Sequence, residues 1–203
     1  VARELDHRIG NLFALVNGLV NVSVRDGDSG RAVADAIRGR LSALHDAHAL
    51  VRRSDGSSLT MVELLRTLLR PYDDGSGRVS VAGDDLQIAA SAVTPKALIF
   101  HELATNAVKY GALRDGKGML HARISRWNDR LIINWKERCR SPSPASAGTG
   151  FGSKLFKTIV EGQLHGTTVR VSTPDGLIVE MSLPLSSLAG TTATEANREP
   201  APQ

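Results

Sequence analysis

The stretch that decides the fold is His101-Glu102-Leu103-Ala104-Thr105-Asn106-Ala107-Val108-Lys109-Tyr110-Gly111. In a helix, Glu102, Asn106 and Lys109 share one face, because they follow i, i+4, i+7 spacing. A separate apolar stripe, suited to packing on a sheet, consists of Phe100, Leu103, Ala104 and Ala107. A carboxylate, an amide oxygen and an ammonium together suit a metal-bound polyphosphate. The alternative is the solvated face of an ordinary amphipathic helix.

Composition narrows the class of protein around this helix. The 203 residues suffice for one large domain or two small ones, and 25 Lys and Arg against 21 Asp and Glu suit anionic ligands such as nucleotides. No basic run with interleaved aromatic residues is present, which argues against nucleic-acid binding. The single cysteine, Cys139, excludes an internal disulfide framework and predicts a reducing, cytoplasmic location. No apolar stretch approaches ~20 residues, so no membrane span is expected.

The N-terminal residues 1–55 predict an antiparallel helical hairpin. The apolar positions of its two helices are Leu5, Ile9, Leu12, Val16 and Leu19, then Val33, Ile37, Leu41, Leu44, His48 and Val51, with turn residues at 26–30. Each helix buries only one face in such a hairpin, so a homodimer through a four-helix bundle is expected. The alternative is packing of the hairpin on its own downstream domain. Because the chain opens on Val1 and enters helical periodicity at once, we expect an upstream sensor domain to be missing.

Residues 56–185 predict a mixed α and β unit, which makes the whole chain an α+β protein. Thr60 and Glu63 resemble a capping box that begins a helix ending at Leu69. Thr94 is expected as the N-cap of the polar helix, with Pro95 at its first helical position. The remaining expected strands lie at 79–81, 86–89, 120–124, 131–135, 168–172 and 177–183, and those at 120–124 and 131–135 form a hairpin that turns at Asn128-Asp129. A lid at 141–152, a helix at 153–164 and a disordered tail at 186–203 complete the expectation.

A glycine cluster, Gly148-Thr149-Gly150-Phe151-Gly152, precedes the helix expected at residue 153. Closely spaced glycines allow backbone N–H groups to approach phosphates, and the following helix N-terminus favours an anion. A lone cluster of this kind is weak evidence. Its position after the polar helix and a strand hairpin makes a phosphate-binding lid the preferred interpretation.

These features together resemble the ATP-binding domain of the Bergerat-fold ATPases, an α/β sandwich. Within that group, the chain resembles the HWE-type sensor histidine kinases over residues 3 to about 184. The matching residues are Glu4 to Asn11 around His7, Arg40 to Leu44, Ala47 to Leu50, His101, and Trp135-Lys136-Glu137. The resemblance implies ATP and Mg²⁺ as cofactors and a response-regulator receiver domain as partner.

The resemblance also implies roles for the residues of the polar helix. Asn106 would ligate Mg²⁺, and Lys109 would contact phosphate. Glu102 would assist proton removal or hold the metal shell. His101 would either orient the Glu102 carboxylate or support the lid, and the sequence does not choose between these roles.

Further roles fall on the strand and the lid. Glu137 would accept a hydrogen bond from the adenine amino group, for which a carboxylate is suited. Trp135 is either a core aromatic residue, the preferred interpretation, or a platform that stacks on adenine. Gly148, Gly150 and Gly152 would bind the phosphates through the backbone.

His7 is the implied phosphoacceptor. It lies two residues from Leu5 and from Ile9, about 200° round the helix, and therefore faces away from the apolar stripe. A neutral ring nitrogen can act as nucleophile while Asp6 orients the other nitrogen. The alternative is an unremarkable surface histidine. His48, by contrast, falls on the apolar stripe and is interpreted as structural.

Departures from the family pattern keep two rival functions open. Arg138-Cys139-Arg140 stands where glycines commonly follow the Trp-x-Glu element, Gly10 stands where lysine is usual, and Asp6 stands where asparagine is frequent. The first departure favours a histidine phosphotransferase-like relay module with a degenerate ATP site. The second rival is another Bergerat-fold ATPase, against which the phosphoacceptor hairpin argues.

Overall fold

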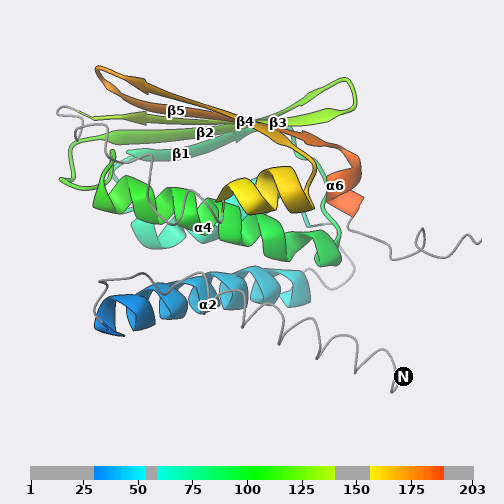
Figure 1. Cartoon of the computed structure of the whole chain (residues 1–203), viewed down its shortest axis with the longest axis horizontal. Coiled ribbons are helices and arrows are strands. Elements are labelled where there is room, and N and C mark those ends of the chain that lie inside the picture. The colour runs from blue at the N-terminus through cyan, green and yellow to red at the C-terminus, as the bar shows by residue number, and fades with distance from the viewer. Residues whose placement is uncertain (1–29, 54–58, 140–155, 190–203) are drawn as a thin grey trace, which may run out of the picture.

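A computed structural model describes residues 30–53, 59–139 and 156–189, and the element labels are those of Figure 1. The elements are α2 (Gly30–Arg53), α3 (Met61–Leu69), η1 (Arg70–Tyr72), β1 (Val79–Gly83), η2 (Ala90–Ala92), α4 (Val93–Lys109), β2 (Met119–Trp127), β3 (Arg130–Arg138), the π-helix η4 (Thr158–Gln163), β4 (Thr167–Thr173), β5 (Gly176–Pro184) and α6 (Ser186–Ala189). Figure 1 shows three layers: the sheet, then α4 with its neighbouring helices, then α2. The predicted first helix and the predicted lid lie outside the described residues.

The sheet has five strands in the order β1-β2-β3-β5-β4. β1 pairs with β2 in parallel, and the other three pairings are antiparallel. The predicted hairpin between β2 and β3 is confirmed, with its turn at Asn128 and Asp129. Asn128 has φ 53°, a left-handed conformation that asparagine tolerates and that tight hairpin turns require.

The core lies between the sheet and the α4 layer. The predicted apolar stripe of α4 is confirmed, since Phe100, Leu103, Ala104 and Ala107 are all buried. On β3, alternate residues from Leu131 to Glu137 are buried, as expected for a strand with one face against helices. The core therefore continues without a break from the sheet into the helices.

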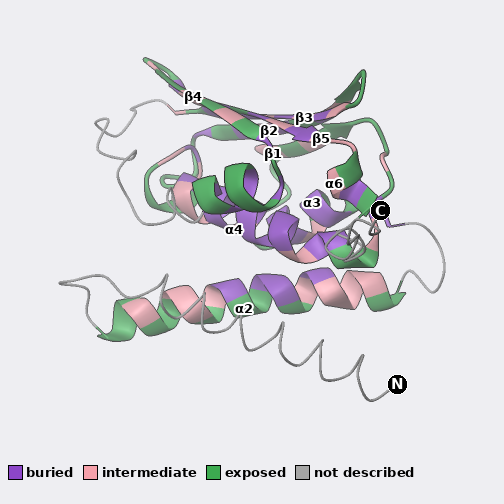
Figure 2. Cartoon of the chain, turned by 45° about the vertical axis from the view of Figure 1, so that its right-hand side comes forward, coloured by how far each residue is buried: buried purple, intermediate pink, exposed green. Residues whose placement is uncertain are grey.

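Helix α2 follows the alternative of packing on the downstream unit. It contacts α4 and α3, and its buried residues are Arg40, Ala43, Leu44 and Ala47. Figure 2 shows that this buried face points toward the α4 layer. The predicted stripe is rotated relative to this face, because Leu41 keeps 43% of its surface exposed. The first helix of the hairpin lies outside the described residues, so the predicted homodimer stays a prediction.

The predicted N-terminal cap of α3 is confirmed, and that of α4 is wrong. The Thr60–Glu63 capping box is present in full, with Thr60 Oγ1 accepting from the Glu63 N–H and the Glu63 carboxylate accepting from the Thr60 N–H. For α4, the prediction of Thr94 as N-cap is wrong, because the helix begins at Val93. The Thr94 hydroxyl instead lies 3.1 Å from Nε2 of His48 on α2.

Residues 86–89 do not form the predicted strand. Their backbone pairs with the segment before α3, where Met61 N–H donates to the Leu86 carbonyl and Ile88 N–H donates to the Leu59 carbonyl. Only an isolated bridge joins Thr60 and Gln87. The apolar residues of this segment are therefore explained by packing under α3 rather than by the sheet.

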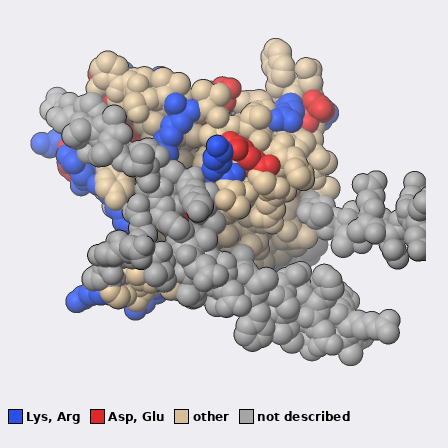
Figure 3. Space-filling model, in the orientation of Figure 1, with Lys and Arg blue, Asp and Glu red and all other residues tan. Residues whose placement is uncertain are grey.

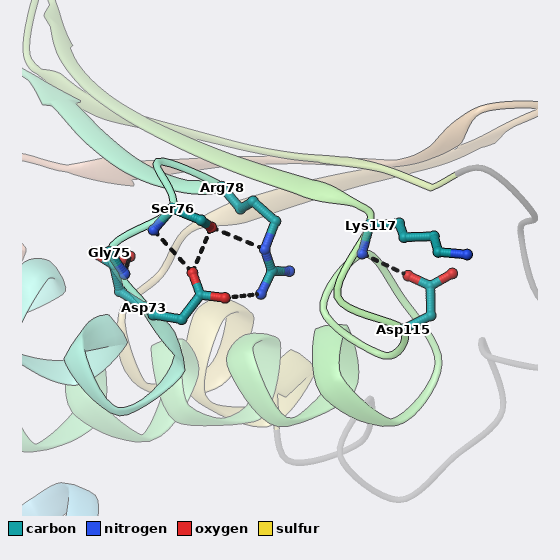
Figure 4. A network of polar contacts seen from close by, with 7 residues as sticks. Asp73, Gly75, Ser76, Arg78, Asp115 and Lys117 are labelled. Atoms are coloured by element: carbon teal, nitrogen blue, oxygen red, sulfur yellow. Dashed lines mark hydrogen bonds and ion pairs between the residues drawn. The ribbon is translucent and has the colours of Figure 1, made fainter.

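The turn before β1 is held by its own polar side chains. Asp74 accepts hydrogen bonds from the Ser76 N–H and from Arg78 Nη2, the latter at 2.6 Å. These bonds hold the pKa of the Asp74 carboxyl below its usual range. Figure 4 shows this turn beside the loop that carries Asp115 and Lys117. The turn thus sets where β1 enters the sheet.

Lys96 joins α4 to α6. Its buried ammonium donates to the Ser187 carbonyl at 2.6 Å, and burial lowers the pKa of Lys96 to about 8. Leu188 of α6 is buried in the core. The prediction of a disordered tail from residue 186 is therefore wrong for residues 186–189, because α6 has both an apolar contact and a buried hydrogen bond.

We expect Lys96→Met to remove a pH-dependent part of the stability. The pKa of Lys96 is about 8 when folded and about 10.5 when unfolded, so the unfolded chain binds more protons between these values. The free energy of unfolding should therefore rise with pH through this window in the wild type, by on the order of 2 kcal/mol relative to the variant. Urea unfolding of both proteins at about pH 7.5, 9 and 10.5 measures the difference. A difference that stays constant over this range would contradict the assignment.

Candidate functional site

The polar face of α4 divides into an accessible half and a covered half. Asn106 is half-buried and Lys109 is exposed. Among the described residues, neither the Asn106 amide nor the Lys109 ammonium forms a hydrogen bond or ion pair with a side chain. Glu102, one turn earlier, is only 5% exposed. The end of α4 near Lys109 therefore keeps its polar groups available to a ligand.

Glu102 is covered by α2. Its Oε1 accepts from Arg40 Nε at 2.6 Å, and both side chains are buried. Arg40 therefore occupies the side of the Glu102 carboxylate that faces α2, and a metal ion cannot bind there. This argues against the predicted role of Glu102 as a metal ligand.

His101 lies against α2 at Gly39, where an added Cβ would stand 3.1 Å from Nε2 of the imidazole. Burial lowers the pKa of His101, while the nearby Glu102 carboxylate acts in the opposite direction. No hydrogen bond joins His101 to Glu102 among the described residues. His101 therefore contributes to the α2–α4 contact and does not orient the carboxylate directly.

Glu137 ends the buried face of β3. Its Oε1 accepts from the Trp135 indole Nε1–H at 2.9 Å, and its Oε2 accepts from the Ala112 backbone N–H at 3.0 Å. The side chain is 2% exposed, and burial raises the pKa of its carboxyl against the opposing effect of these two bonds. The carboxylate is thus fixed in orientation at the end of α4.

Trp135 is fully buried, so it is the core aromatic residue and does not stack on a ligand in this conformation. Its contribution to the site is the hydrogen bond to Glu137. The position of the Glu137 carboxylate also requires glycine at residue 111, because a Cβ there would stand 1.8 Å from Glu137 Oε2. The glycine that ends the polar motif therefore admits the carboxylate to the end of the helix.

Sequence reasoning missed three residues of this site. It quoted Arg40 and Gly111 inside motifs but gave them no role. Arg170 was not considered, although it lies on β4 opposite Val179 and is half-buried. Burial lowers the pKa of Arg170, while the charge of Glu137 raises it. The sequence shows Arg170 as a basic residue within an alternating strand. Its position relative to Glu137 cannot be inferred until the order of the strands in the sheet is known.

Other predicted site residues lie outside the described residues. They are His7, Gly148, Gly150 and Gly152. On the face visible in Figure 3, charged side chains are scattered, and basic and acidic groups adjoin in places. No group of three or more His, Cys, Asp or Glu side chains that could hold a metal occurs in residues 30–53, 59–139 and 156–189. Within the same ranges, no helix has both the length and the apolar character to span a membrane.

Comparison with known proteins shows which family the chain resembles. Residues 4–85 match the family model described as HWE histidine kinase. A blue-light-activated histidine kinase of Rhizobium johnstonii is 33% identical over 186 residues, covering 89% of this chain and 52% of the relative. Blue-light-activated histidine kinase 1 of Erythrobacter litoralis is 30% identical, covering 91% of this chain and 53% of the relative. The chain thus spans about half the length of these relatives.

Solved structures share the fold. The Erythrobacter litoralis EL346 blue-light activated histidine kinase superposes with a TM-score of 0.70 at 18% identity, covering 92% of this chain and 61% of that chain. Its separate histidine kinase domain gives a TM-score of 0.59, covering 75% of this chain and 78% of that chain. The α+β fold described above is therefore that of histidine kinases. In sequence, residues 4–85 match the HWE histidine kinase model, and similarity to the named histidine kinases extends over 89% and 91% of the chain.

Proposed function

We propose that the chain is the catalytic core of a sensor histidine kinase. It binds ATP with Mg²⁺, transfers the γ-phosphoryl group to His7, and passes it on to an aspartate of a response-regulator receiver domain. Residues 1–55 form the phosphoacceptor hairpin, and residues 56–185 form the ATP-binding unit. The observation that carries the proposal is the buried Glu137 carboxylate, oriented by Trp135 and Ala112 at the end of α4.

The residues present fit a magnesium nucleotide. Glu137 offers a fixed acceptor to an exocyclic amine, and the side chains of Asn106 and Lys109 have no side-chain partner among the described residues. An amide oxygen suits a hard cation, and an ammonium suits a phosphate. Mg²⁺ in nucleotide sites takes most of its ligands from phosphates and water, so one or two protein ligands suffice. We assign Asn106 as the Mg²⁺ ligand and Glu102 as the group that accepts the proton during transfer.

The proposed step needs a nucleophile, a proton acceptor and neutralisation of charge. ATP supplies the γ-phosphoryl group, and the neutral ring nitrogen of His7 attacks it. An N–P bond forms, and the P–O bond to ADP breaks with its electron pair on ADP. The Glu102 carboxylate accepts the proton that the imidazole loses. Lys109 stabilises the charge on the phosphoryl oxygens, and Asn106 would hold Mg²⁺, which would supply further charge neutralisation.

One assay tests this function against its rivals. Incubation with γ-labelled ATP should leave acid-labile, base-stable label on the wild-type chain. A relay module with a degenerate site would show no label from ATP but would accept phosphate from a phosphorylated receiver domain. An ATPase of another class would release labelled phosphate and retain none on the protein.

We expect Glu137→Ala to weaken ATP binding about 10- to 100-fold and to narrow a wild-type preference for ATP over GTP. The reason is that a buried carboxylate accepts from the adenine amine, whereas guanine presents a carbonyl at that position. Isothermal titration calorimetry with both nucleotides measures the effect. Equal affinities of wild type and variant for both nucleotides would show that Glu137 does not read the base.

Glu180→Ala is the matched control for Glu137→Ala, and Gly162→Ala is the matched control for a second test variant, Gly111→Ala. Glu180→Ala removes an exposed carboxylate from β5 and should leave ATP binding unchanged. Gly111→Ala should weaken binding as Glu137→Ala does, because its Cβ displaces the carboxylate, whereas Gly162→Ala meets no atom within 4 Å. Repeating the titrations at raised salt removes contributions from exposed charges such as Arg138.

A further inference from the structure

The Arg40–Glu102 ion pair crosses the interface between the phosphoacceptor hairpin and the nucleotide-binding helix. The two residues are 62 positions apart in the chain, and their side chains retain 6% and 7% of their surface. A buried ion pair carries a large desolvation cost, and it is stable only when its geometry is good. The 2.6 Å contact from Nε meets this requirement.

This ion pair is a fixed part of the site. On the same face of α2, Ala43, Leu44 and Ala47 are buried and belong to the core that α3, α4 and the sheet share. Separation of α2 from α4 would expose these residues to water. The ion pair therefore lies within a packed interface between α2 and α4.

Arg40 engages one carboxylate oxygen of Glu102. The other oxygen, Oε2, accepts no hydrogen bond from the residues that the structure describes. The further ionisable groups near Glu102 are Tyr72 on η1 and His101 on α4, with Lys109 near His101. Burial raises the pKa of Tyr72, and the charge of Glu102 raises it further. A carboxylate with one oxygen anchored and one available is arranged to receive a proton in a single direction.

We propose that Arg40 is a positioning residue for phosphoryl transfer, which orients the Glu102 carboxylate so that Oε2 takes the proton from the attacking histidine. This inference rests on the proposed kinase function. It adds a role for the second hairpin helix, which holds a group of the nucleotide-binding unit in place. The expected effect is on the chemical step, because Arg40 reaches the polar face of α4 through its ion pair with Glu102.

The test compares Arg40→Met and Arg40→Lys with Arg38→Met in the full chain. Arg38 is the matched control, since it forms an ion pair of the same 2.6 Å length with Asp35 on the exposed side of the same helix. We expect Arg40→Met to lower the rate of autophosphorylation at saturating ATP by about 10- to 100-fold with an unchanged Kd for ATP. Arg40→Lys should recover part of the rate, and Arg38→Met should match the wild type.

A double-mutant comparison separates positioning from a structural effect. In a Glu102→Gln background, Arg40→Met should cost little further rate, because its target is already removed. Full activity of Arg40→Met, or equal losses in both backgrounds, would overturn the inference while leaving the kinase function intact. A loss of ATP affinity that matches the loss of rate would overturn it also. A wild-type chain that takes no acid-labile label would overturn the proposed function and this inference with it.

Discussion

His7→Ala abolishes acid-labile labelling from ATP and leaves nucleotide binding intact: this is the largest effect that we expect. The label requires a nucleophilic ring nitrogen, and alanine offers none, so the residual signal should equal that of a reaction without protein. The measurement is scintillation counting of the protein after acid and after base treatment, with ATP binding followed in parallel by calorimetry.

His45→Ala is the control for this variant. His45 is an exposed histidine on α2 with no assigned role, and its replacement should leave the label unchanged. Label that persists in His7→Ala would end the assignment of His7 as phosphoacceptor. Label lost in both variants would indicate that the histidines act through the stability of the hairpin.

Asn106→Ala should lose at least about 100-fold in the rate of autophosphorylation with little change in folding. The amide oxygen is a hard-cation ligand, and its loss removes charge neutralisation in the transition state more than ground-state binding. Because Asn106 is only half-buried and its side chain bonds to no described residue, the fold does not depend on it. Initial rates over a range of Mg²⁺ concentration, with thermal unfolding of both proteins, measure the two effects.

The matched variant is Asn134→Ala. Asn134 lies on β3 between Arg123 and Glu180, on the face opposite the buried Ile133 and Trp135. Its replacement should change neither the rate nor its dependence on Mg²⁺. Near-normal phosphorylation by Asn106→Ala at saturating Mg²⁺ would refute the ligand assignment.

Local features of the sequence predicted local structure well. The capping box of Thr60 and Glu63, the turn at Asn128 and the apolar stripe of α4 all depend on residues a few positions apart. Such interactions can be predicted from the spacing of residues in the sequence, because helices and strands repeat with fixed periods. The same reasoning failed at residues 86–89, where a short apolar run fits a strand and a buried segment equally well.

Part of the site was also determined by the sequence alone. The spacing of Glu102, Asn106 and Lys109 places three polar groups on one helix face, and the Trp135-Lys136-Glu137 motif places alternate residues on one face of a strand. Which of these groups remain accessible is a different property. It depends on what packs over the helix and the strand, and spacing carries no information about that.

Only the tertiary structure decided how these groups are partnered. Arg40 meets Glu102 across 62 residues, because α2 packs on the downstream unit through a face that is rotated from its predicted stripe and that includes Arg40. Trp135 donates to Glu137 because the strand turns both side chains toward the core, and Gly111 leaves room for the carboxylate. These partnerships join elements distant in sequence. Burial makes them necessary, because a buried polar group without a partner is costly, and this condition exists only once the layers have assembled.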